Sequence, residues 1–321
     1  MSVVERKQFS ELLEALDFNA KLQNAPLVIR AYRNQDKVWE YHDASRSVKF
    51  QKELGLDTQF FNVYDPSRIT TFLSGEKGGM LLTAPDWKEF FLSRTSYKYL
   101  VPDIGFICSR YCSKLLSYFL GPTLKNLIFA VPRLAMLEIE KMGYNTKVQR
   151  SSIDRSKLFY AMNEINFLKA NTEFTLLPPL GVSLMTNFAS IDEGGHSGVW
   201  IRKEIADVVG KFKKRTIEFR NDVIVFLTCD PISSFAAEAE ELGTCYFGTT
   251  SEETGTISFS DQAQLFDFIL DTSMVYDKVK IDFCSGDKVF RSYSVEVVPG
   301  NLLAPDFVLD KLRMMALSTT S

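Results

Sequence analysis

The chain has 321 residues, of which 45% are hydrophobic and 24% charged, and its formal net charge is −3. This composition is typical of a soluble globular protein with two or three domains, and the net charge excludes a globally basic nucleic-acid binder but not a local basic surface. Only 2 histidines are present, which argues against a histidine metal centre and most histidine-dependent acid–base catalysis.

The N-terminal part of the chain predicts one helix followed by antiparallel strands. Apolar residues recur at three- and four-residue spacing over 5–18, which is typical of an amphipathic helix. The segment 27–43 alternates in polarity around a polar turn at 33–35 and predicts a hairpin. Two further strands are predicted over 47–51 and 59–65.

The next segment has residues that can begin and end a short helix. Asp65 can cap a helix over 65–75, a proline stands at its first position, and Gly75 can end it. Strands are predicted over 80–83 and 97–101.

The character of the sequence then changes. Apolar, helix-rich segments bounded by proline and glycine extend over 104–150 and resemble neither flank. We therefore expect an inserted or linking helical segment there, between a first domain at 1–103 and a second domain at 151–321. The second domain can be divided further into subdomains at 151–230 and 231–321.

The second half restarts the helix-then-strand pattern. Helices are predicted over 152–171, 201–215 and 260–273, the last of them capped by Ser260. Antiparallel hairpins are predicted over 216–230 and 279–298.

Four helix–hairpin units follow from these predictions, and they begin near Arg6, Asp154, Ile201 and Asp261. Any one short match can arise by chance, but four units in order favour a true repeat, and their uneven spacing excludes a solenoid. Helices that lead directly into antiparallel strands predict an α+β fold with helices on one face of each sheet.

Three segments, 6–43, 59–74 and 257–298, resemble the DNA polymerase sliding clamps, in particular the compact phage type. They are similar to the opening helix and hairpin of a clamp domain, to its second part, and to the closing helix and hairpin of the last domain. The resemblance implies a non-enzymatic processivity factor without cofactor or metal, which encircles duplex DNA and works with a DNA polymerase and a clamp loader. Two clamp-like domains per chain imply a homotrimer, and three imply a dimer.

A sliding clamp needs cations that face phosphates without reading bases, because it must move along DNA. The densest basic cluster lies in 201–215. The predicted DNA-binding residues are Arg6, Lys7, Arg68, Arg155, Lys157, Arg202, Lys203, Lys211, Lys213, Lys214 and Arg215. The predicted helix 260–273 opposes this interpretation, because it carries three aspartates and no cation.

Two other function classes stay open. A structural or interaction protein, such as a virion component, could use the same repeats without DNA. A hydrolase or nuclease could be built around His196, which lies beside Asp192 and Glu193 in a glycine-rich loop. No nucleophile elbow, phosphate-binding loop or zinc-finger spacing accompanies that histidine in the sequence.

The five cysteines are scattered and odd in number, so we expect reduced thiols and a cytoplasmic protein, in the host cytoplasm if it is viral. Cys108 and Cys112 could share a helix face, but the sequence offers no second pair of Cys or His ligands that would complete a metal site with them. We therefore expect both to be buried thiols. No signal peptide is expected, because the first residues are charged early and lack a long apolar core. No membrane span is expected, because the most apolar run is interrupted by Gly121, Pro122 and Lys125.

Overall fold

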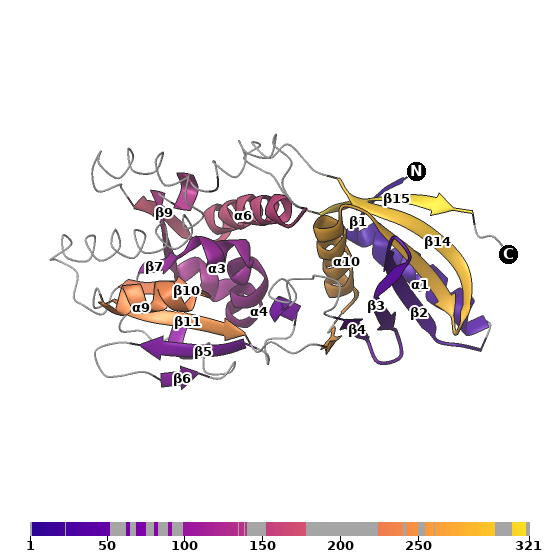
Figure 1. Cartoon of the computed structure of the whole chain (residues 1–321), viewed down its shortest axis with the longest axis horizontal. Helices are drawn as coiled ribbons and strands as arrows, with labels where there is room; N and C mark the ends of the chain where they lie inside the picture. Colours follow the sequence, from indigo (N-terminus) through magenta and orange to yellow (C-terminus); the bar gives the residue numbers. More distant parts are fainter. Residues whose placement is uncertain are drawn as a thin grey trace. The chain divides into compact units, whose positions relative to one another are not determined.

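The structure of the chain is a computed structural model, shown in Figure 1. It describes residues 2–22, 24–51, 62–64, 69–74, 80–82, 89–91, 99–133, 135–137, 139, 152–177, 224–239, 242–249, 254–259, 261–298 and 310–318.

The chain forms two compact units, and both are discontinuous in sequence. Unit 1 consists of Met1–Asp65, Arg150–Phe159 and Ser251–Ser321, and unit 2 of Pro66–Gln149 and Tyr160–Thr250. These boundaries differ from the expected domains at 1–103 and 151–321, because strands from both ends of the chain pair in one sheet of unit 1. The segment 104–150, expected as an insertion or linker, supplies a strand and helices of unit 2.

Unit 1 is an antiparallel sheet of eight strands in the order β1-β15-β14-β13-β2-β3-β4-β12. The strands are β1 (Ser2–Glu5), β2 (Leu27–Arg33), β3 (Asp36–His42), β4 (Ser47–Gln51), β12 (Thr254–Ser258), β13 (Val279–Ser285), β14 (Lys288–Val297) and β15 (Lys311–Leu317). Two helices, α1 (Arg6–Leu22) and α10 (Gln262–Tyr276), contact each other and the central strands. A short 3-10 turn, Asn62–Tyr64, also belongs to this unit.

The element order in unit 1 occurs twice. The series β1-α1-β2-β3-β4 is followed by β12-α10-β13-β14-β15. The first strand of each series pairs with the last strand of the other series. Strand β1 pairs with β15 of the other half, and β12 pairs with β4. The halves meet at β2 and β13, where Arg30 lies opposite Asp282. The sheet therefore has the pairing of a local two-fold repeat.

Aromatic side chains fill the space between the helices and the sheet of unit 1. Phe9 of α1 lies 5.4 Å from Phe266 of α10, measured between ring centroids. Phe268 of α10 contacts Trp39 of β3 at 5.4 Å and Tyr64 at 5.6 Å. These rings are buried, as the apolar spacing of both helices predicts.

Most of the elements predicted for unit 1 are confirmed: the first helix, the hairpin at 27–43, the strand at 47–51, the last helix and the hairpin at 279–298. Two details are wrong. Asp261 caps α10 in place of Ser260, because its carboxylate accepts a hydrogen bond from the Gln264 N–H at 2.9 Å. Within the predicted strand at 59–65, Asn62–Tyr64 form a 3-10 turn, and the other residues lie outside the described part of the chain.

Unit 2 contains a seven-stranded mixed sheet in the order β6-β5-β11-β10-β7-β8-β9. Its strands are β5 (Ile69–Ser74), β6 (Met80–Leu82), β7 (Tyr99–Pro102), β8 (Ile128–Pro132), β9 (Glu173–Leu177), β10 (Ile224–Thr228) and β11 (Gly243–Thr249). Its helical segments are α3 (Ile104–Cys108), the π-helix Tyr111–Leu116, α4 (Ser117–Leu120), the 3-10 helix Gly121–Asn126, α9 (Pro231–Ala239) and the part of α6 (Ser152–Asn171) that begins at Tyr160. Strands β9, β8, β7, β10 and β11 are parallel, and β5 and β6 extend the sheet by antiparallel pairing.

Three predictions for unit 2 are wrong. The expected helix at 65–75 contains strand β5, because Ile69, Thr70 and Thr71 are β-branched and suit a sheet. Strand β8 interrupts the expected helical segment. Strand β10, expected as one arm of a hairpin, has parallel neighbours on both sides. A short apolar run buried on both faces is typical of such a central parallel strand. The chain as a whole mixes helices with two sheets, as an α+β protein does.

Candidate functional site

The strand order of unit 2 reverses between β7 and β10. In the sheet, β8 and β9 lie on one side of β7, and β10 and β11 lie on the other side. The carboxyl ends of β7 and β10 therefore lie side by side, and Pro102 is opposite Leu227. In open parallel sheets such a switch point is where ligands bind. We call the residues at and near these two strand ends the switch-point cluster: Asp103, Ser109, Thr228, Cys229, Asp230 and Ser233, with Tyr246 of the neighbouring strand β11.

Asp103 is a fully buried member of the switch-point cluster. It caps α3, because its Oδ1 accepts a hydrogen bond from the Phe106 N–H at 2.6 Å. Its Oδ2 accepts a hydrogen bond from the Thr228 hydroxyl, and both side chains are fully buried. Asp103 thus joins the end of β10 to the start of α3.

Asp230 plays the same part for α9. Its Oδ2 accepts hydrogen bonds from the Ser233 N–H and the Ser233 hydroxyl, both at 2.9 Å. Its own N–H donates to the Thr228 Oγ1 at 3.0 Å. The hydroxyl of Thr228 therefore connects the two carboxylate caps.

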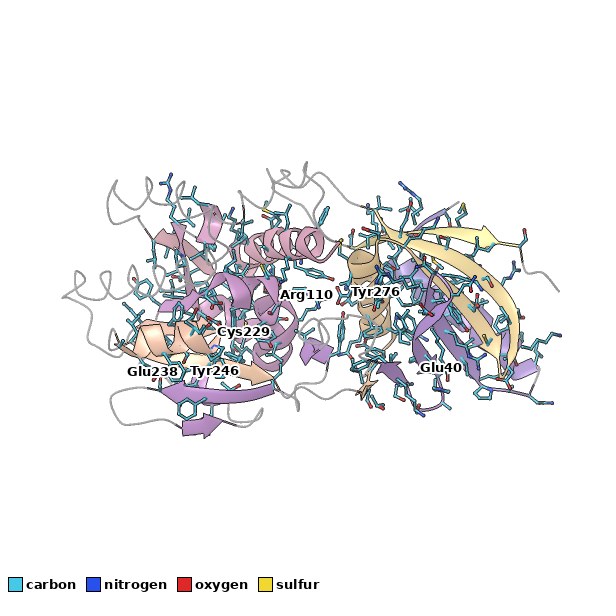
Figure 2. The ribbon with its side chains drawn as sticks, viewed as in Figure 1. Glu40, Arg110, Cys229, Glu238, Tyr246 and Tyr276 are labelled. Atoms are coloured by element: carbon cyan, nitrogen blue, oxygen red, sulfur yellow. The ribbon has the colours of Figure 1, made fainter. Side chains whose placement is uncertain are left out.

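Cys229 lies between these two aspartates, and Figure 2 labels it together with Tyr246 of β11. Its Sγ is 3.7 Å from the Ser109 Oγ. Burial, followed by the charge of Asp103, raises the pKa of the Cys229 thiol well above its ordinary value. The thiol therefore stays protonated near neutral pH, and a thiolate nucleophile is not formed here. Burial, with Cys229 and Asp230, also raises the pKa of Tyr246.

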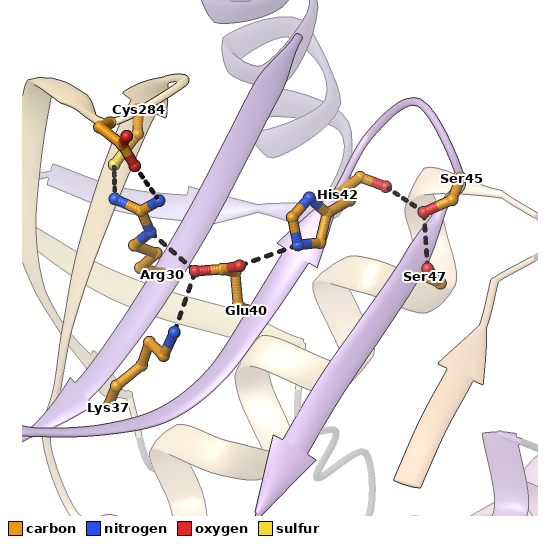
Figure 3. A network of polar contacts seen from close by, with 8 residues as sticks. Arg30, Lys37, Glu40, His42, Ser45, Ser47 and Cys284 are labelled. Atoms are coloured by element: carbon orange, nitrogen blue, oxygen red, sulfur yellow. Dashed lines mark hydrogen bonds and ion pairs between the residues drawn. The ribbon is translucent and has the colours of Figure 1, made fainter.

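A second polar network lies on the sheet of unit 1 (Figure 3). The Arg30 Nε donates to the Glu40 Oε2 at 2.8 Å, and its Nη2 donates to Asp287 at 3.1 Å. Glu40 also contacts Lys37 at 3.2 Å and the His42 Nε2 at 2.9 Å. This network compensates its own charges and offers no free catalytic base.

Three of the predicted DNA-binding residues lie in the part of the chain whose side chains the structure describes: Arg6, Lys7 and Lys157. Arg6 donates to Asp267 of α10 at 2.6 Å, so the acidic residue of the last helix partly neutralises it. Lys7 is exposed on α1, near the exposed Glu11 and Glu14 of the same helix. Lys157 is half-buried on α6. The other predicted residues lie outside the part whose side chains are described: Arg68, Arg155, Arg202, Lys203, Lys211, Lys213, Lys214 and Arg215.

The enzymatic alternative finds no new support. His196, with its neighbours Asp192 and Glu193, lies outside the described residues. In the described ranges no three His, Cys, Asp or Glu side chains gather as a metal site would require, and Cys108 and Cys112 are buried free thiols. No helix among the same residues combines the length and apolar character that crossing a bilayer demands.

The sequence patterns do not predict the switch-point cluster, because 216–230 fits an antiparallel hairpin and the parallel pairing of β10 with β7 is non-local. A signal was present: two short apolar runs, 99–102 and 224–228, are each followed within two residues by an aspartate that can cap a helix.

Comparison with known proteins gives only weak likenesses to solved structures. The chain matches no protein-family model and no curated protein. A solved domain of a functionally unknown protein from Methanocaldococcus jannaschii DSM 2661 aligns with a TM-score of 0.34 and 17% identity, over 49% of this chain and 95% of that one. A likeness of this size carries no conclusion about fold or function.

Proposed function

We propose that the protein is a ring-forming, non-catalytic clamp that encircles duplex DNA and tethers a DNA polymerase to it. The observation that supports the proposal is the repeated β-α-β-β-β order of unit 1, with two helices packed side by side on one sheet. Helix–sheet repeats of this kind are what the resemblance of the sequence to sliding clamps implies. In a closed ring, a weak attraction to phosphates is sufficient, because the DNA cannot leave sideways.

Edge strands offer the means of ring closure. Strands β1 and β12 end the eight-stranded sheet of unit 1, and each has one neighbour in the described part of the chain. Edge strands carry unpaired backbone N–H and C=O groups that can pair with another copy. Pairing of β12 with β1 of the next copy is heterologous, and a heterologous contact gives a closed ring when the rotation between copies closes.

The number of chains per ring follows from the number of clamp-like domains. A homotrimer of chains with two such domains contains six domains in the ring. A dimer of chains with three such domains contains six as well. If unit 1 alone has this role, six chains are needed, and if unit 2 contributes as well, three are needed. The mass of the closed species distinguishes these two cases.

The DNA contacts are assigned to Lys7 of α1 and to the basic cluster 202–215 in the sequence. Replacing Lys211, Lys213 and Lys214 with Ala should reduce the slope of log affinity against log salt by up to about 0.9 for each lost phosphate contact. The matched control is Lys288→Ala, at an exposed position of β14. An unchanged slope in the triple variant would remove these residues from the DNA-binding surface.

A second candidate is an assembly of the same kind that does not bind DNA, such as a structural protein of a virion. The acidic character of α10 favours it, because this helix and its cap carry Asp261, Asp267 and Asp271 and no cation. This candidate predicts the same oligomer and no retention on circular DNA.

A further inference from the structure

The loops that follow β7 and β10 lead to opposite faces of the unit 2 sheet. After β7 the chain crosses to β8, and after β10 it crosses in the other direction, to β11. Crossovers between parallel strands are right-handed, so opposite directions place α3 and α9 on opposite faces. Phe106 of α3 contacts Phe247 of β11, with 5.1 Å between ring centroids, and this contact marks the face that α3 covers. The two loops therefore part at the switch point, where doubly-wound sheets bind their ligands.

Three polar side chains converge where the loops part: Tyr246, Cys229 and Asp230. All three are partly exposed, and Figure 2 labels Tyr246 and Cys229. Tyr246 lies opposite Thr228, the last residue of β10, and side chains alternate along a strand, so its ring is on the face opposite that of Phe247. Cys229 and Asp230 follow Thr228 directly. Burial raises the pKa of the Tyr246 hydroxyl, and Cys229 and Asp230 raise it further, which places that hydroxyl near both of them.

These groups can accept hydrogen bonds from a ligand and donate hydrogen bonds to it. Asp230 already accepts from the Ser233 N–H and hydroxyl, at 2.9 Å each, but a carboxylate has about four acceptor positions. Among the described residues, none forms a hydrogen bond with the Tyr246 hydroxyl, which can donate and accept. The Cys229 thiol is protonated and can donate weakly, since burial raises its pKa well above the ordinary value. The cluster therefore suits a ligand group that donates and accepts at once.

The charges around this cluster oppose an anionic ligand. Asp103 and Asp230 are carboxylates, and Asp230 already caps the N-terminus of α9, where an anion would otherwise bind. Arg110 is the cation nearest to Ser109 in the sequence, but it is almost fully buried, and its guanidinium carbon lies 4.3 Å from the ring of Tyr160 of α6. An ammonium ligand fits less well than a hydroxyl, because it donates hydrogen bonds and cannot accept them. Uncharged hydroxyl groups meet both requirements.

We propose that the switch-point cluster binds the vicinal diol of an uncharged sugar, as a free pentose or as part of a nucleoside. Asp230 accepts hydrogen bonds from the two hydroxyls, and Tyr246 and Cys229 donate to their oxygens. Carboxylates bind ribose hydroxyls in the same way in dinucleotide-binding sheets, at the carboxyl ends of the strands. The half-buried ring of Tyr246 adds apolar surface for the sugar or an attached base. The site lies within unit 2 and does not depend on DNA binding or on ring formation.

Calorimetric titration of the full chain with adenosine tests the proposal. The expected dissociation constant is about 0.1 mM, a value typical of a ligand of this size. The dideoxy analogue of adenosine lacks the diol and should bind at least about 10-fold more weakly. Adenosine monophosphate should bind roughly 3- to 10-fold more weakly than adenosine at low salt, because the two carboxylates repel its phosphate. Binding of D-ribose as well would identify the free pentose as a ligand, and binding of adenosine alone would assign the site to nucleosides.

Two substitutions connect this binding to the cluster. Asp230→Asn keeps a side chain that can cap α9 but loses the charge, and it should weaken adenosine binding about 10-fold or more. Tyr246→Phe removes only the hydroxyl and should weaken binding roughly 3- to 10-fold. The matched controls are Asp36→Asn, at an exposed position of β3, and Tyr32→Phe, at a half-buried position of β2, and both should bind adenosine as the wild type does.

Three results would overturn the diol site. The first is the absence of binding for both adenosine and D-ribose at about 10 mM, far above the dissociation constant expected for adenosine. The second is equal affinity for adenosine and its dideoxy analogue. The third is wild-type affinity in both Asp230→Asn and Tyr246→Phe. The comparison with the dideoxy analogue uses the wild-type chain, so it decides the question even if a variant does not fold.

Discussion

The ion pair between Arg30 and Glu40 should stabilise unit 1, and its contribution should disappear in acid. Burial raises the pKa of Glu40, but hydrogen bonds from Arg30 and Lys37 outweigh it, so that the pKa falls from 4.5 to about 2. The full shift would correspond to roughly 3 kcal/mol. Lys37 is about half exposed, with 48% of its side chain accessible, so water screens part of the interaction. We expect about 1–2 kcal/mol for Glu40→Gln at pH 7.

The pH dependence follows from the lowered pKa. The contribution of Glu40 is fully present above about pH 4.5, and it is lost as the pH falls from 4.5 toward 2. Urea unfolding at pH 7, 5, 4 and 3 can be followed by the fluorescence of the buried Trp39, after Trp87 and Trp200 are replaced with Phe. The difference between wild type and Glu40→Gln should shrink below pH 4.5.

The matched control is Glu14→Gln, at an exposed position of α1, which should change the free energy of unfolding by less than about 0.5 kcal/mol. The reasoning is refuted if Glu40→Gln unfolds at the same urea concentration as the wild type at pH 7. It is refuted equally if the loss is as large at pH 3 as at pH 7.

Two further substitutions test the packing of the two units. Phe268→Ala should destabilise unit 1 by about 3–5 kcal/mol, because it removes a buried ring that contacts the rings of Trp39, Tyr64 and Phe259. Phe18→Ala, at a ring that is 64% exposed, should cost less than about 0.5 kcal/mol in the same urea titration. Thr228→Val should cost about 1–3 kcal/mol in unit 2, because the buried Asp103 loses a hydrogen-bond donor. The exposed Thr175→Val on β9 is its control, and equal melting temperatures of the two variants would contradict the assigned role of Thr228.

The elements of unit 1 could be predicted because their patterns are local. The helix Arg6–Leu22 has an apolar stripe of period 3.6, and the strands beside it alternate around polar turns. The similarity between 29–43 and 281–295 also has a structural counterpart, since both segments form hairpins and their first strands pair at the centre of the sheet. The pairing of β4 with β12 could not be predicted from the sequence, because about 200 residues, including all of unit 2, separate the two strands along the chain.

The helix predicted at 152–171 and the strands predicted at 80–83 and 97–101 are confirmed. The parallel sheet of unit 2 could not be predicted, because its signals are ambiguous in a single sequence. A short apolar run such as 128–132 fits a buried helix segment and a buried parallel strand equally well. The cap residues at 65–75 suggest a helix, but the β-branched residues between them pair with β11. Asp103 and Asp230 lie far apart in the sequence, and only the parallel pairing of β7 and β10 brings their strand ends together. The hydrogen bond from the Cys112 N–H to the buried Glu164 depends in the same way on packing between distant helical segments.

The central claim is that identical chains close into a ring around DNA, and retention on DNA of different topology tests it most directly. The mass of the free protein in solution should be three or six times the 36.5 kDa of one chain. After loading at low salt and a wash at high salt, the protein should stay on closed circular DNA and leave the same DNA once it is linearised, because only free ends let a ring slide off. A monomer in solution, or equal retention on both forms, would contradict the account.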